Sequence, residues 1–66
     1  MKVEYFIVNS SGNVMLKIKD DFDGSTLLYD LAKVLNQRTD KAYKRILQRD
    51  VSGFYINPGT VEIYVK

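Results

Sequence analysis

The sequence contains no cysteine, no histidine and no tryptophan, and only one proline. The lack of cysteine excludes disulfide bonds and thiol nucleophiles, and the lack of cysteine and histidine together excludes the common zinc sites. Without histidine the chain also lacks the usual acid–base catalyst near neutral pH. No glycine-rich phosphate loop or other cofactor motif is present. We therefore expect a protein that is not an enzyme, holds no cofactor or metal, and acts by binding.

Long hydrophobic runs are also missing, since the longest one covers only residues 5–8. A membrane-spanning helix needs about 20 apolar residues, so neither a spanning segment nor a secretory signal is predicted. The lack of cysteine fits a reducing compartment. The expected location is therefore the cytoplasm, with no membrane partner.

What the sequence does contain is typical of a folded domain. Of its 66 residues, 45% are hydrophobic and 27% are charged, a balance that disordered chains do not have. A chain of this length buries only about 60% of the surface that it exposes when unfolded, so its stability is modest. We expect a single small domain over residues 1–66. Oligomerisation would add to the stability of so small a domain.

Alternating apolar residues in the first third predict a β-hairpin. Residues 3–8 and 14–19 each alternate, and residues 9–13 between them are turn formers. The first strand is apolar on both faces, which favours a central position in a sheet. The second strand carries Lys17 and Lys19 on its outward face, which is typical of a protected edge.

The middle third predicts two helices. Apolar residues follow a period of 3.6 between residues 26 and 37, which is typical of a helix with one buried face. Thr39 and Asp40 are expected to cap a second helix that ends near Asp50. The apolar arc of the first helix is formed by Leu27, Leu28, Leu31, Val34 and Leu35.

The last third predicts a second hairpin. Its strands cover residues 54–56 and 61–65, and the turn between them contains Pro58 followed by Gly59, a combination that favours a tight turn. The cross-strand pairs expected from this turn are Ile56 with Val61 and Phe54 with Ile63, with Tyr55 and Tyr64 on the opposite face.

These segments together predict an α+β fold in the order ββααββ. The expected sheet is small, four-stranded and rich in antiparallel pairs, and the two helices cover one of its faces. A winged helix-turn-helix is the alternative architecture, because two helices with a short link precede a hairpin. The expected core consists of Tyr5, Ile7, Leu16, Ile18, Leu27, Leu31, Val34, Leu35, Ile46, Leu47, Ile56 and Ile63.

Basic residues are concentrated in one part of the chain, and they form the first candidate site. Between Lys33 and Arg49 there are six cations and one acid, although the whole protein has a net charge of only +2. Such a helix face suits the phosphates and base edges of a nucleic acid. A solvated surface helix would give the same pattern. The candidate nucleic-acid-binding residues are Arg38, Lys41, Lys44, Arg45, Gln48 and Arg49.

Exposed tyrosines form the second candidate site. Tyr55 and Tyr64, with Glu62 between them in the sequence, are predicted to lie on the open face of the last hairpin. Tyrosine is enriched at protein interfaces and can also stack on single-stranded bases. Alternatively, these side chains only cover the sheet. An apolar open face favours a homodimer or a partner protein.

Two functions follow from these surfaces. The first is a small regulator that binds nucleic acid through the basic face of the second helix. The alternative is an inhibitor or adaptor that binds a partner protein through the tyrosine-bearing face, as small proteins of phages and mobile elements often do. The basic charge would then suit an acidic partner protein.

Overall fold

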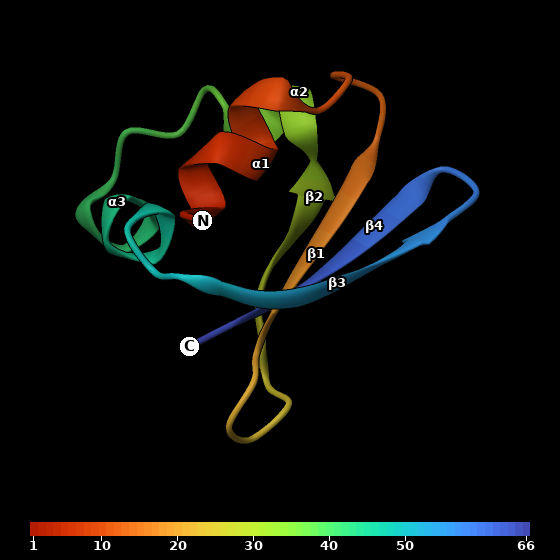
Figure 1. The fold of residues 1–66 in the computed structure, drawn as a ribbon. Helices are drawn as coiled ribbons and strands as arrows, with labels where there is room; N and C mark the ends of the chain where they lie inside the picture. Colours follow the sequence, from red (N-terminus) through yellow and green to blue (C-terminus); the bar gives the residue numbers. More distant parts are fainter.

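Four strands form one mixed sheet in the computed structural model, which describes residues 1–66 (Figure 1). The strand order is β2-β1-β4-β3. The two central strands, β1 and β4, run parallel, and each edge strand pairs antiparallel with its neighbour. In chain order the elements are α1 (Val3–Asn9), β1 (Met15–Asp20), β2 (Thr26–Leu31), α2 (Ala32–Leu35), α3 (Lys41–Leu47), β3 (Val51–Asn57) and β4 (Thr60–Val65).

One hydrophobic cluster joins the sheet to all three helices. Ile18 of β1 lies beside Ile63 of β4 in the parallel pair, and both are completely buried. The fold is therefore a small α+β domain with a four-stranded sheet, as expected. The buried residues are Val3 and Ile7 from α1, Leu16, Ile18, Leu28, Ile63 and Val65 from the sheet, Ala32 and Leu35 from α2, and Tyr43 from α3.

The expected first strand is wrong, because residues 3–9 form the helix α1. Val3 and Ile7 lie four residues apart and are both buried, which satisfies a helical period as well as a strand alternation. The two patterns differ at Tyr5, which a strand would bury and which is 59% exposed here. A helix therefore precedes the first strand, and the order ββααββ does not describe the whole chain.

The expected first helix is also wrong over most of its length. Residues 26–31 form the edge strand β2, and only residues 32–35 are helical. The reason is tertiary: β2 pairs antiparallel with β1, which places Leu28 opposite Ile18 in the core. As a result β1 lies in the centre of the sheet and not at its edge. The helix-turn-helix alternative fails for the same reason, because α2 has only four residues.

The second helix and the last hairpin are confirmed. α3 covers residues 41–47 and begins at the predicted cap, Asp40, but it ends three residues before the predicted end near Asp50. The turn at Pro58 and Gly59 gives the expected register, and Gly59 has a φ of 75°, which a glycine adopts without strain. The observed pairs include Ile56 with Val61 and Phe54 with Ile63.

Three residues of the expected core are exposed. Tyr5 lies on the outer side of α1, Val34 on the outer side of α2, and Ile56 on the edge strand β3, where it is 73% exposed. The side chain of Ile56 points to the face of the sheet that the register predicts. At this position, however, β3 extends beyond the helices that cover that face. None of the helices is long and apolar enough to cross a membrane.

Candidate functional site

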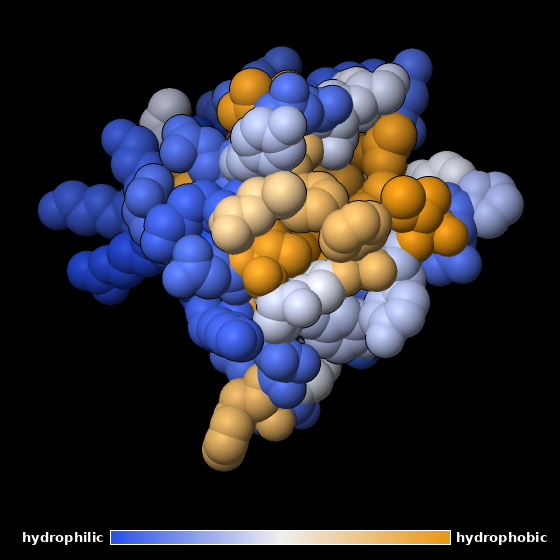
Figure 2. All heavy atoms as spheres, viewed as in Figure 1, coloured by the Kyte–Doolittle hydropathy of each residue, from blue (hydrophilic) through white to orange (hydrophobic).

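The outer face of α3 carries a group of polar and basic side chains. Lys41, Lys44, Arg45 and Gln48 together line a shallow depression of the surface that contains no hydrophobic residue. The structure therefore brings together four of the six residues that the sequence assigned to a nucleic-acid site. In Figure 2 this part of the molecule, on the left over α3, is strongly hydrophilic. We call these four residues the basic face.

Local capping chemistry explains why α3 begins where it does. The Asp40 carboxylate accepts a hydrogen bond of 3.1 Å from the backbone N–H of Tyr43, which is the usual N-cap interaction. On the opposite side of the helix from the basic face, Tyr43 is buried and Ile46 and Leu47 are half-buried. The helix is thus held by its cap and its apolar side, and the side chains of the basic face form no ion pair within the protein.

Arg38 is not part of the basic face, because it binds the cap residue. Its guanidinium donates two hydrogen bonds to the Asp40 carboxylate, at 2.9 and 2.8 Å, and lies 5.1 Å from the centre of the Tyr43 ring. The Arg38 hydrogen bonds are the main cause that lowers the pKa of Asp40 to about 2. The charge of Arg38 is therefore largely balanced within the protein.

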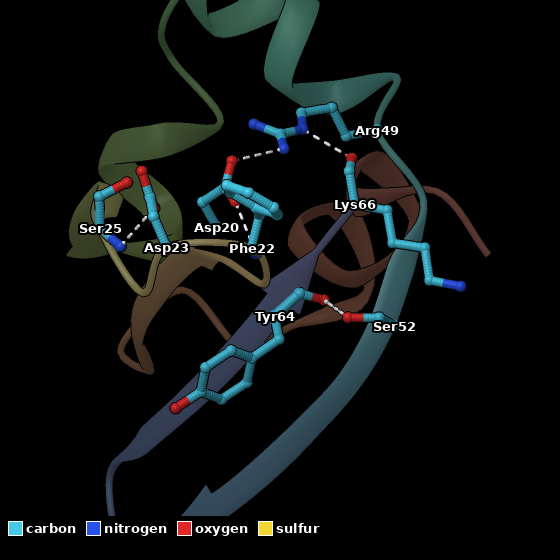
Figure 3. Close-up of polar contacts among 8 residues, drawn as sticks. All are labelled: Asp20, Phe22, Asp23, Ser25, Arg49, Ser52, Tyr64 and Lys66. Carbon is cyan, nitrogen blue, oxygen red and sulfur yellow. Dashed lines mark hydrogen bonds and ion pairs between the residues drawn. The ribbon is translucent and has the colours of Figure 1, made fainter.

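Arg49 is also separate from the basic face (Figure 3). It donates a 2.8 Å hydrogen bond to the carboxylate of Asp20, at the end of β1, and a 2.7 Å bond to the backbone carbonyl of Lys66. The Arg49 bond is the main cause that lowers the pKa of Asp20. Arg49 is half-buried and links the end of the helix to the end of the sheet, a structural contact that the sequence did not predict.

The acids of the turn between β1 and β2 are used for local structure. Asp20 accepts a bond of 2.7 Å from the N–H of Phe22, and Asp23 accepts one of 2.9 Å from the N–H of Ser25 (Figure 3). Such side-chain-to-backbone bonds are typical of aspartate in turns. Nowhere in the chain do three acids come together as metal ligands.

The remaining cations differ in whether they have an acidic partner. Besides Arg38 and Arg49, only Lys2 forms an ion pair, with Asp50 at 3.2 Å. Lys41, Lys44 and Arg45 have none. The same holds for Lys17, Lys19, Lys33 and Lys66, but the first three lie together on one helix face. These three positive charges are exposed and uncompensated, which is what a polyanion requires.

A second surface lies on the face of the sheet opposite the core. Tyr55 and Tyr64 meet there edge to face, with ring centres 5.7 Å apart. The hydroxyl of Tyr64 donates a hydrogen bond to the carboxylate of Glu62, and this bond is the main cause that raises the pKa of Tyr64. The structure thus brings together all three residues that the sequence assigned to partner binding.

Three further members of this surface are not among the residues that the sequence assigned to partner binding. Tyr29 of β2 is 60% exposed, and the ammonium of Lys17 lies 5.5 Å from the centre of its ring. The ammonium of Lys19 lies 5.6 Å from the ring of Tyr64. The β-forming residues Thr26 and Tyr29 are the local signal that could have indicated a strand here and thus placed Tyr29 on the sheet.

These contacts form a row across all four strands. The register places Tyr29 beside Lys17, Lys17 beside Glu62, and Glu62 beside Tyr55. Side chains that are direct neighbours across strands support one another's positions. We call Tyr29, Lys17, Glu62 and Tyr55, with Lys19 and Tyr64 next to them, the tyrosine face.

Comparison of the chain with protein-family models, with curated proteins and with solved structures finds no match, so the evidence for its function is the arrangement of its own residues.

Proposed function

We propose that the protein is a small, non-catalytic cytoplasmic regulator that binds nucleic acid through the basic face of α3. The observation that carries this proposal is the grouping of Lys41, Lys44 and Arg45 on one exposed face without any acidic partner. Lysine and arginine bind phosphates by charge, and Arg45 and Gln48 have the donors that read base edges. Arg38 and Arg49, which the sequence added to this set, are left out because both are bound within the fold.

The dimensions of α3 fit this role. An α-helix with its side chains is about 10–12 Å in diameter, and the major groove of DNA is about 12 Å wide. The cap and the buried side of α3 fix its backbone, so the basic side chains can contact a ligand without disturbing the core.

The proposal is tested by reversing two charges. We expect the Lys44→Glu, Arg45→Glu double variant to lose binding to a fluorescent DNA duplex, measured by anisotropy at low salt. For the unchanged protein, three neutralised phosphates predict a loss of about 40-fold in affinity between 50 and 200 mM salt. Single-stranded DNA and duplex RNA probes in the same assay would identify the preferred nucleic acid.

A control variant separates a specific face from net charge. Lys33→Glu with Lys66→Glu changes the net charge by the same amount, at two exposed positions outside the basic face. We expect this control to retain most of the affinity. Equal binding by the charge-reversed α3 variant and the unchanged protein would refute the proposal.

The tyrosine face supports a second candidate, a protein-binding inhibitor or adaptor. The specific observation is that Tyr55 and Tyr29 are 64% and 60% exposed. Each also has a direct cross-strand neighbour that supports its position, Glu62 for Tyr55 and Lys17 for Tyr29. Ordered, exposed tyrosines provide contact area at a low entropic cost. Lys17 and Lys19 at the same surface would suit an acidic partner protein.

This candidate is tested by truncating the face. We expect the Tyr55→Ala, Tyr64→Ala double variant to lose a partner protein that the unchanged protein retains, while its circular dichroism spectrum stays the same. Retention of that partner at an unchanged level by the double variant would count against this role.

A further inference from the structure

The outer edge of β3 is free along most of its length. Its first residue is covered, because the N–H of Val51 donates to the carbonyl of Met1 at 2.7 Å, and Lys2 and Asp50 form a bridge beside it. Residues 52–57 have β4 on one side and no strand on the other. This segment is the unpaired edge of the sheet.

Beyond the register shift near its start, the free edge has none of the usual protection against pairing. β3 carries no charged side chain, and three consecutive residues, Phe54, Tyr55 and Ile56, are 48%, 64% and 73% exposed. Phe54 and Ile56 face the helical side, where Phe6 of α1 lies 5.1 Å from the Phe54 ring, and Tyr55 faces the other side. An uncharged edge strand that is apolar on both faces is a template for another strand.

The opposite edge of the sheet is different. β2 contains the charged residue Asp30, whereas β3 contains none, and the chain turns into α2 directly after Leu31. A charged side chain on an edge strand hinders strand addition. The sheet therefore has one edge open to pairing and one edge that is protected.

The backbone of the free edge fits this use. Residues on an antiparallel strand point their N–H and C=O groups alternately toward and away from the neighbouring strand. Asn57 pairs with Thr60 across the tight turn, so Phe54 and Ile56 are the residues whose backbone groups point away from β4. The N–H of Val51 also points away from β4. Simple alternation would point it toward β4, and the register shift between Val51 and Gly53 accounts for the difference.

We propose that β3 pairs antiparallel with β3 of a second copy of this chain, about a two-fold axis at Tyr55. In this register Tyr55 lies opposite Tyr55 of the second copy, and Phe54 lies opposite Ile56. The outward backbone groups of Phe54 and Ile56 then bond to their counterparts. The result is a dimer with one continuous eight-stranded sheet.

Three observations favour a second copy as the occupant. The strand is self-complementary, because each aromatic Phe54 meets a β-branched Ile56, a favourable cross-strand pair. No charge of one copy lies opposite a like charge on the other strand, although the chain carries +2 overall. The protected edge at β2 ends the assembly at two copies, since each sheet has one open edge.

The size of the contact predicts a weak dimer. An aromatic side chain buries about 150–250 Å² at most, so three partly exposed residues provide a few hundred Å² per copy. A standard stable interface buries about 800 Å² per partner. We therefore expect a dissociation constant on the order of 100 µM and a clear dependence on concentration.

Sedimentation equilibrium between about 10 µM and about 1 mM tests this assembly. We expect the mean mass to rise from the monomer value of 7.6 kDa toward twice that value. The Ile56→Lys variant should remain a monomer, because it places a lysine on the edge. Val8→Lys is the matched control, at an exposed apolar residue of α1 outside the sheet, and should dimerise like the unchanged protein.

Hydrogen exchange distinguishes edge pairing from other contacts. In the dimer the amides of Phe54 and Ile56 should become protected as the concentration rises, since they gain acceptors. A mass of 7.6 kDa at every concentration would overturn the proposal. So would a dimer that leaves these amides unprotected or is unaffected by Ile56→Lys, or assembly beyond two copies. None of these outcomes depends on nucleic-acid binding, so the two proposals are tested independently.

Discussion

At the scale of single residues, Asp40 combines two roles that can be separated by mutation. Its carboxylate accepts the N-cap bond from Tyr43 and also binds the guanidinium of Arg38. Both contacts favour the charged carboxylate, so its pKa in the folded state, about 2, lies below the ordinary value of 3.8. The contribution of Asp40 to stability is therefore complete above pH 3.8 and is lost as the pH falls toward 2.

The two roles predict different behaviour for two variants. Asp40→Ala should lower the melting temperature by several degrees at neutral pH, because the cap is lost. Asp40→Asn keeps a capping oxygen but cannot titrate, so its stability should fall less than that of the unchanged protein between pH 4 and pH 2. Thermal unfolding over this pH range measures both effects. A steep acid dependence that persists in Asp40→Asn would show that other groups dominate.

At the scale of elements, the predictions succeeded where the signal was local. The hairpin of β3 and β4 follows from the turn at Pro58 and Gly59, and α3 follows from its cap at Asp40. Each of these signals acts within a few residues. The basic face and the pair of Tyr55 and Tyr64 were predictable because they depend only on these two elements.

The predictions failed where partners far apart in sequence decide the conformation. Residues 3–9 and 26–31 are short and apolar, and their spacing fits a helix and a strand almost equally well. Pairing with β1 settles the second segment, and β1 in turn has β4 as its other neighbour, which leaves no place for the first segment as a strand. Such long-range competition is not visible in a local pattern. For that reason the row that joins Tyr29, Lys17 and Glu62 was not predicted, although Lys17 was expected on the outward face of its strand.

Two isoleucines test this arrangement of the elements. The sequence assigns both Ile63 and Ile56 to the core, whereas Ile63 is completely buried on central β4 and Ile56 is mostly exposed on β3. Ile63→Ala should reduce the free energy of unfolding by about 2–5 kcal/mol. Ile56→Ala should change it by no more than about 0.5 kcal/mol. Urea denaturation of dilute protein compares them, and similar losses would contradict the strand order.

At the scale of the whole molecule, the two candidate surfaces belong to different layers. The basic face lies on α3, and the tyrosine face lies on the side of the sheet that faces away from the core. Apolar side chains gather between α1 and β3 in the view of Figure 2, next to the free edge that we assign to a second copy. Pairing at β3 would leave the basic face exposed on both copies and would join the two tyrosine faces at Tyr55.

The parallel pair at the centre of the sheet has a consequence for how the chain folds. Each hairpin is local, but β1 and β4 join residues 45 positions apart, such as Met15 and Thr60. The chain must close this long loop before Ile18 and Ile63 can meet, and loop closure carries an entropic cost that only the finished core offsets. Neither hairpin alone contains a core. We therefore expect folding to be slow for so short a chain and to occur in a single cooperative step.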